Sequence, residues 1–303
     1  MPVVEVEQLV KRYGELSAVD GLSFSVEKGE VFALLGPNGA GKTTTVEILE
    51  CLRAKTSGRV RVLGHDVETQ ASRIRERIGV LPQDFNTFDR LTVRENVRYF
   101  RDLFGSNADV DELLASVGLT EKADTLYLEL SGGLKQRTGV AIALVNDPEL
   151  VFLDEPSTGL DPHARRQVWE LIRKLRAGGR TVFLTTHYME EAAVLSDRVG
   201  IVHRGKLVAL DAPDAIVRAH AGSTTVRLPA EPGLADRVAG WLPRARVRVD
   251  NAHLSIDPGD HRLEEVLSAL ASKATLASLE VRTPNLEDAF LALTGERLGG
   301  VGA

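Results

Sequence analysis

The sequence contains no apolar stretch long enough to cross a membrane. Its longest apolar runs include VFALL (31–35) and AIALV (141–145), whereas a spanning helix needs about 18 or more such residues. The N-terminal residues MPVVEVEQLVKRYGE lack the apolar core of a secretory signal. The one cysteine, Cys51, cannot form an intramolecular disulfide, which is typical of proteins in a reducing compartment. These absences predict a soluble, cytosolic protein.

The chain also lacks an excess of positive charge. It has 37 Lys+Arg against 43 Asp+Glu, a formal net charge of −6. This acidity argues against a protein that coats nucleic acid through net positive charge. Hydrophobic residues make up 43% and charged residues 26%, a balance that excludes wholesale disorder. A length of 303 residues predicts one large domain or two domains.

The first two thirds of the chain alternate between strand and helix patterns. Apolar runs at 31–35, 149–154 and 180–187 predict buried strands, and the pattern over 162–176 predicts a long helix. Buried strands that alternate with helices indicate a largely parallel sheet. Residues 84–130 contain helical segments and no convincing strand. We therefore expect an α/β core with an attached helical subdomain, at about 84–140.

After about residue 220 the pattern changes to short alternating strands. The expected order is βαββαβ, followed by a last helix over 285–295, and this order predicts a small α+β domain of the split ferredoxin-like type. The sequence thus predicts two domains, at 1–218 and 219–303.

A phosphate-binding loop is predicted at Gly36–Thr43, where GPNGAGKT fits the pattern G-x-x-x-x-G-K-[ST]. The glycines allow backbone N–H groups to point at phosphates, and the following helix adds the positive end of its dipole. Lys42 is expected to reach the β- and γ-phosphates, and Thr43 to bind Mg²⁺. A glycine-rich turn without a ligand is the alternative, but the position between a buried strand and a helix favours the phosphate loop.

Two weaker motifs follow. LVFLDEP (150–156) places Asp154 and Glu155 at the end of an apolar strand, where Asp154 suits Mg²⁺ and Glu155 suits polarising a water for attack. The alternative is an acidic turn that caps a helix. LSGG (130–133) precedes a helix, so that Ser131 and the glycine amides would form an anion site. Taken alone, LSGG fits an ordinary serine N-cap better.

Read in order, these motifs resemble those of ATP-binding cassette (ABC) ATPases over residues 1 to about 215. The resemblance implies that Tyr13 stacks on adenine, that Gln83 links metal, water and helical subdomain, and that His187 contacts the γ-phosphate. The implied catalytic residues are Glu155, His187 and Gln83, and the implied metal ligands are Thr43, Gln83 and Asp154. The implied nucleotide-binding residues are Tyr13, Gly36, Pro37, Asn38, Gly39, Ala40, Gly41, Lys42, Thr43, Thr44, Ser131, Gly132, Gly133 and Asp161.

The resemblance further implies ATP and Mg²⁺ as ligands and a second cassette as partner, because the signature of one subunit completes the site of the other. We expect a homodimer; a paired paralogue is the alternative. Asp161, in STGLD (157–161), is implied to contact the opposite subunit. One departure is Leu134, where the signature usually has glutamine. We expect hydrolysis to be retained, since Ser131 and the amides of Gly132 and Gly133 remain.

Residues 81–97 and the tail at 282–295 resemble the exporter branch that carries its permease as a separate polypeptide, including ATPases of the daunorubicin-resistance type. The resemblance implies export of a drug, antibiotic or lipid-like compound, an integral-membrane permease as partner, and a peripheral location on the inner face of the cell membrane. No nucleic-acid partner is expected.

Two other functions remain open. A soluble ABC ATPase that acts on ribosomes or DNA usually has two cassettes or long coiled coils, whereas this chain has one cassette and no heptads. A regulator that senses ATP without hydrolysing it is disfavoured by the intact Lys42, Glu155 and His187.

Overall fold

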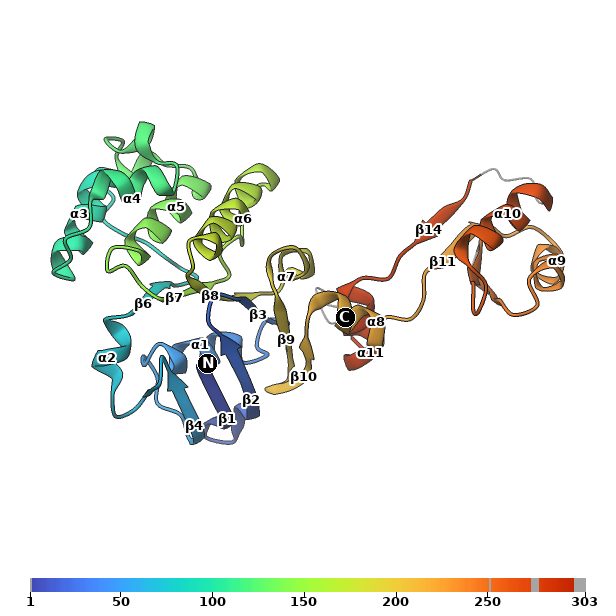
Figure 1. The fold of residues 1–303 in the computed structure, drawn as a ribbon, viewed down its shortest axis with the longest axis horizontal. Helices are drawn as coiled ribbons and strands as arrows, with labels where there is room; N and C mark the ends of the chain where they lie inside the picture. Colours follow the sequence, from blue (N-terminus) through green and yellow to red (C-terminus); the bar gives the residue numbers. More distant parts are fainter. Residues whose placement is uncertain (1, 251, 274–277, 297–303) are drawn as a thin grey trace. The chain divides into compact units, whose positions relative to one another are not determined.

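The computed structural model describes residues 2–250, 252–273 and 278–296 (Figure 1). The chain forms two compact units, the first ending at Pro213 and the second beginning at Asp214. Residues 297–303, which the sequence assigned to the C-terminal domain, lie outside the described part of the chain. Across the described residues, no helix is long and apolar enough to span a membrane.

The first unit is built around a six-stranded sheet in the order β10-β9-β3-β8-β7-β6. All neighbouring strands are parallel except the pair β9 and β10, which forms an antiparallel hairpin. The strands are β3 (Val31–Leu35), β6 (Ile78–Leu81), β7 (Leu150–Asp154), β8 (Thr181–Thr186), β9 (Arg198–His203) and β10 (Lys206–Asp211). Strands β3, β7 and β8 are buried along their whole length, which explains their continuous apolar sequences.

A second, antiparallel sheet packs against the first in the order β2-β1-β4-β5. Its strands are β1 (Pro2–Tyr13), β2 (Leu16–Glu27), β4 (Ser57–Val62) and β5 (His65–Asp66). The shared core contains α1 (Lys42–Leu49) and a row of aromatic rings. Phe24 of β2 stacks on Phe32 of β3 with ring centroids 5.4 Å apart, and Phe183 of β8 lies 5.3 Å from Phe32. This core holds the start of α1 at the end of β3.

Helices α3, α4, α5 and α6 lie on the other side of the central sheet, away from β1, β2 and β4, and α3, α4 and α5 form a group there (Figure 1). Residues 84–130 contain one isolated bridge and no strand, as the sequence predicted. The capping box of Thr92 and Glu95 begins α3. The helices are α2 (Ala71–Arg75), α3 (Val93–Leu103), α4 (Val110–Ser116), α5 (Gly132–Ala143), α6 (Pro162–Ala177) and α7 (Met189–Leu195), with short 3₁₀ helices at Thr120–Lys122 and Tyr127–Glu129.

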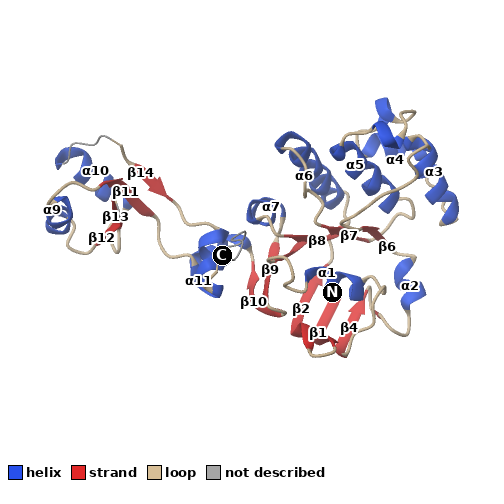
Figure 2. Cartoon of the chain, turned by 180° about the vertical axis from the view of Figure 1, so that it is seen from behind, coloured by secondary structure: helices blue, strands red, loops and turns tan. Residues whose placement is uncertain are grey.

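The second unit contains a four-stranded antiparallel sheet in the order β12-β13-β11-β14 (Figure 2). This is the strand order of the split βαββαβ plan, as expected. One face is covered by α9 and α10, whose Val238 and Leu270 join a separate core. The elements are α8 (Pro213–His220), β11 (Thr225–Pro229), α9 (Leu234–Trp241), β12 (Arg246–Asp250), β13 (His253–Asp257), α10 (Leu263–Lys273), β14 (Glu280–Arg282) and α11 (Leu286–Thr294).

Candidate active site

Four parallel strands of the central sheet deliver the predicted site residues to one edge. The loop at 36–41 follows β3, Glu155 follows β7, His187 follows β8 and Gln83 follows β6. The amide of Gly36 donates to the carbonyl of Thr186 (3.2 Å), which joins the loop to the end of β8. Carboxyl ends of parallel strands are the usual ligand-binding edge of such sheets.

The backbone of the glycine loop is closely packed and requires glycine at two positions. At Gly41, which has φ of +99°, a Cβ would lie 2.3 Å from the carbonyl oxygen of Ala18. At Gly36, a Cβ would lie 2.3 Å from the carbonyl oxygen of Val202. Gly41 is also the N-cap of α1 and supplies no side-chain acceptor, so the first amides of the helix are left to an anionic ligand.

The substitution Gly41→Ala is therefore expected to lower the free energy of unfolding by about 3 kcal/mol, because the new methyl group meets backbone and the positive φ is strained. Gly39→Ala is the matched control. Gly39 also has positive φ (+78°), but a Cβ at this position would meet nothing within 4 Å, so a loss of about 1 kcal/mol is expected. Urea denaturation of both variants measures the difference, and equal losses would contradict the packing argument.

Lys42, the first residue of α1, is buried at the centre of the loop. Its Nζ donates to the carbonyl oxygens of Gly36 (2.8 Å) and Pro37 (3.2 Å) and lies 3.3 Å from Oε1 of Glu155. Burial lowers the pKa of Lys42, and the charges of Glu155 and Asp154 oppose this effect. The loop thus holds an ammonium group that is poorly solvated and close to the carboxylates of Asp154 and Glu155, which are called the paired carboxylates below.

Asp154 is buried at the end of β7 and accepts a hydrogen bond from the hydroxyl of Thr185. Burial raises the pKa of Asp154, whereas the hydrogen bond from Thr185 lowers it; the charge of Glu155 raises it further, and Lys42 and a hydrogen bond from Thr43 lower it. Asp154 and Thr43 thus place two oxygen ligands side by side, the kind that Mg²⁺ prefers. The geometry fits the metal role predicted for these two residues.

Hydrogen bonds and an ion pair fix both the backbone and the side chain of Glu155. Its φ is +48°, an uncommon conformation for a residue other than glycine, and its amide donates to Oγ1 of Thr185 (3.0 Å). Its Oε2 accepts from the hydroxyl of Thr158 (3.0 Å) and lies 2.9 Å from Nδ1 of His187. The carboxylate is therefore oriented by Lys42, Thr158 and His187 together. Strained backbone of this kind is concentrated at functional sites.

Ser131 and Asp161 lie in a second cluster, at the starts of α5 and α6. Ser131 is the exposed N-cap of α5 and makes no side-chain capping bond. Asp161 is the N-cap of α6 and accepts from the amides of His163 and Ala164, both at 2.9 Å. Gly133 packs so closely on α6 that a Cβ added at this position would lie 2.7 Å from Cβ of Ala164. Within the described residues, no hydrogen bond or ion pair joins Ser131 to Lys42 or the paired carboxylates.

Tyr13 and Gln83 lie at strand ends on the surface. Tyr13 ends β1 with 40% of its area exposed, and the cations of Lys11 and Arg53 lie 5.0 Å and 5.4 Å from its ring centroid. Gln83 follows β6 and is exposed. Their contacts with adenine and with metal stay predictions.

Sequence reasoning missed Thr185 and Thr158, which bond directly to the paired carboxylates. Thr185 pairs with Asp154 in the register of β7 and β8, and no motif indicates that register. Thr158 lies within STGLD, but the pattern does not indicate its bond to Glu155.

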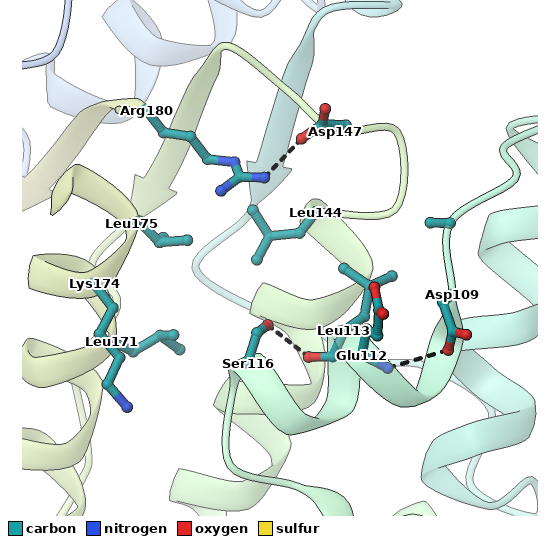
Figure 3. Close-up of a pocket in the computed structure, with 11 residues that line it drawn as sticks. Asp109, Glu112, Leu113, Ser116, Leu144, Asp147, Leu171, Lys174, Leu175 and Arg180 are labelled. Atoms are coloured by element: carbon teal, nitrogen blue, oxygen red, sulfur yellow. Dashed lines mark hydrogen bonds and ion pairs between the residues drawn. The ribbon is translucent and has the colours of Figure 1, made fainter. Parts of the chain in front are cut away.

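A separate cavity of about 390 Å³ lies near the end of α5 and contains none of these residues (Figure 3). It is lined by Leu113, Leu144 and Leu171, and the ion pair of Arg180 with Asp147 (2.7 Å) closes one side. Its lining contains none of the candidate site residues described above, and we assign this cavity no part in nucleotide binding or hydrolysis.

A glycine loop around a buried lysine, next to a strand that ends in two carboxylates, defines a P-loop nucleotide-binding protein. The family model for ABC transporters matches residues 19–158. The Nod factor export ATP-binding protein I of Paraburkholderia xenovorans (strain LB400) is 41% identical over 97% of this chain and 98% of that protein. The chain therefore belongs to the ATP-binding proteins of ABC transporters, and the predicted family is confirmed.

Two solved structures resemble a large part of the chain. A dimeric ATP-binding cassette in a post-hydrolysis state, bound to ADP and Pi, is 27% identical, with a TM-score of 0.62 over 69% of this chain and 98% of that one. A bacterial Atm1-family ABC exporter with ATP bound is 28% identical, with a TM-score of 0.64 over 72% of this chain and 40% of that one.

Proposed function

We propose that this chain hydrolyses ATP and thereby powers export through a separate membrane permease. The observation that carries the proposal is Glu155, a buried carboxylate fixed by Lys42, Thr158 and His187. Relatives that match 97% of the chain are named as export ATP-binding proteins. This similarity favours export over action on ribosomes or DNA, and the complete catalytic set disfavours an ATP sensor that does not hydrolyse.

The glycine loop is the proposed phosphate site. Phosphate oxygens would accept from the amides at the start of α1 and from Nζ of Lys42 in place of its present acceptors, Gly36 and Pro37. Negative phosphate would also stabilise the charged form of Lys42, whose pKa burial lowers. Tyr13 would stack on adenine, with its exposed face turned to the base.

Asp154 and Thr43 would hold Mg²⁺, with Gln83 as a further ligand. The ion would neutralise charge that develops on the transferred phosphoryl group. Among the described residues, no cluster of three or more His, Cys, Asp and Glu side chains has the arrangement of a metal site. Nucleotide oxygens and water would therefore supply the other ligands, as is usual for Mg²⁺.

Removal of divalent metal tests this assignment. Excess EDTA is expected to lower ATP turnover at least about 100-fold, and added Mg²⁺ is expected to restore it, because the transferred charge would otherwise be uncompensated. Asp154→Asn should raise the Mg²⁺ concentration for half-maximal turnover about tenfold or more. Phosphate release measured against Mg²⁺ concentration gives both results, and turnover that persists in EDTA would contradict the assignment.

Glu155 is the proposed base. One of its oxygens would polarise the attacking water while Thr158 and His187 keep the carboxylate in place. A second copy of the chain would complete the site, with Ser131 and the amides of Gly132 and Gly133 contacting nucleotide bound to the first. Leu134 leaves those groups unchanged, so we expect hydrolysis to be retained. The unit after Pro213 is proposed as an accessory or dimerisation domain.

The permease is proposed to dock in an apolar groove of about 430 Å³ between the central sheet and the helical group. Pro82, next to Gln83, lines this groove, together with Phe85 and the exposed ring of Phe104. Docking there would place the chain on the inner face of the membrane. The cargo is proposed to be a drug, antibiotic or lipid-like compound. The relatives are named for Nod factor export and not for drug resistance, so their similarity supports export in general and not the export of drugs in particular.

Reconstitution tests the proposal as a whole. The chain and a candidate permease, a membrane protein from a neighbouring reading frame, are expected together in liposomes to hydrolyse ATP several-fold faster than the chain alone, because docking favours the closed dimer. The permease alone serves as the control. The proposal fails if the two proteins do not associate.

A further inference from the structure

The proposed docking groove has a buried carboxylate in its wall. Glu50 is the C-cap of α1, is 5% exposed, and lines the same cavity as Phe85 and Phe104. Burying a carboxylate costs free energy unless a hydrogen bond or a cation compensates. The cavity surface around Glu50 is mainly apolar and does not supply this compensation.

The nearby basic side chains and Asn146 are engaged elsewhere. Arg75 lines the groove but donates to the carbonyl oxygen of Cys51. Arg53 pairs with Glu47, and Asn146 donates to the carbonyl oxygens of Glu76 and Ile78. Across the described residues, no hydrogen bond or ion pair to the Glu50 carboxylate is present.

The local field around Glu50 is negative. Burial raises the pKa of Glu50 to about 8, and the charges of Asp154 and Glu47 act in the same direction. The carboxylate also lies at the C-terminus of α1, where the helix dipole disfavours an anion and favours a cation. A positive charge in the groove would offset the cost of burial, the repulsion from Asp154 and Glu47, and the unfavourable helix dipole.

We propose that Glu50 binds a lysine or arginine side chain from the permease segment that occupies this groove. The inference rests on the proposed docking of the permease and adds the chemistry of its contact: apolar side chains against the phenylalanines, and one cation at Glu50. Lys42 and Glu50 lie at opposite ends of α1, about 12 Å apart along the helix axis. The ion pair between Glu50 and the permease cation would therefore join the permease to the same helix that begins at the glycine loop.

Affinity measurements with the permease in nanodiscs test the pair. The chain is titrated onto the candidate permease used for reconstitution, and Glu50→Gln is expected to weaken binding about tenfold or more. Glu47→Gln is the matched control, since Glu47 lies on the same helix, pairs with Arg53 and does not line the groove; its affinity should stay within about twofold. Thermal melting checks that each variant is folded.

The cation is then located by substitution of each lysine and arginine in the cytoplasmic segments of the permease by glutamine. One such change should weaken binding of the wild-type chain about tenfold and have no further effect on Glu50→Gln. A wild-type chain that does not bind the permease overturns the proposed function as well. Three results would overturn only the inference about Glu50. They are normal binding of the permease by a folded Glu50→Gln, the failure of every lysine or arginine substitution in the permease to show coupling with Glu50→Gln, and self-association of the chain through the groove without permease.

Discussion

Glu155→Gln is expected to reduce ATP hydrolysis by about 10²- to 10⁴-fold, the usual contribution of a general base. The amide keeps the shape of the side chain but cannot take a proton from water. ATP binding should change by less than about threefold, because phosphate contacts come from the loop and Lys42. The expected result is a chain that binds ATP and dimerises without turning over.

Phosphate release measures turnover, and light scattering with ATP measures dimerisation. Glu149→Gln is the matched control: Glu149 precedes β7, is exposed and pairs with Arg77 at 2.7 Å, at the end of the strand opposite Glu155. Its turnover should be that of the wild type. Hydrolysis by Glu155→Gln at a rate near that of the wild type would exclude Glu155 as the base.

Glu50→Gln is expected to stabilise the isolated chain at alkaline pH, although it should weaken permease binding. The folded-state pKa of Glu50, about 8, lies above its ordinary value of 4.5. Between these values the unfolded chain has lost the proton that the folded chain retains, so stability falls as pH rises. The full difference corresponds to about 5 kcal/mol as an upper figure, reached only above pH 8.

Urea denaturation at about pH 6 and about pH 9 measures this effect. The free energy of unfolding of the wild type should fall relative to that of Glu50→Gln by a few kcal/mol between the two pH values. Glu47→Gln is again the control: it keeps the Glu50 carboxylate, so its free energy of unfolding should still fall as pH rises, but by less than that of the wild type because the charge of Glu47 contributes to the raised pKa of Glu50. If Glu50→Gln is less stable than the wild type at the higher pH, an additional stabilising partner of the carboxylate exists.

The glycine loop was predictable because its sequence pattern is local, with Lys42 at a set distance from Gly36 along the chain. The close approaches that require glycine at Gly36 and Gly41 come from the distant backbone of Val202 and Ala18, and the pattern does not indicate them. Strand periodicity likewise predicted the buried β3, β7 and β8, and the alternation in the tail predicted its strand order. These signals depend on neighbours a few residues apart.

The supports of the site could not be predicted, because they come from residues far apart in sequence. Thr185 meets Asp154 only because β8 pairs with β7 in one register. Asp161 was expected to contact the opposite subunit, and the structure adds that it caps α6. Glu50 gave no signal at all, since an acidic residue at a helix end is usually solvated.

The sequence by itself determined the family, the two kinds of fold and the chemical groups at the site, because each is encoded in short patterns with a fixed local geometry. The tertiary structure alone decided which of those groups touch. Lys42, Asp154, Glu155 and His187 meet because parallel strands end at one edge, while Ser131 lies apart on α5. Only chain packing could bury Glu50 in the wall of an apolar groove, because that wall is assembled from segments distant in the sequence.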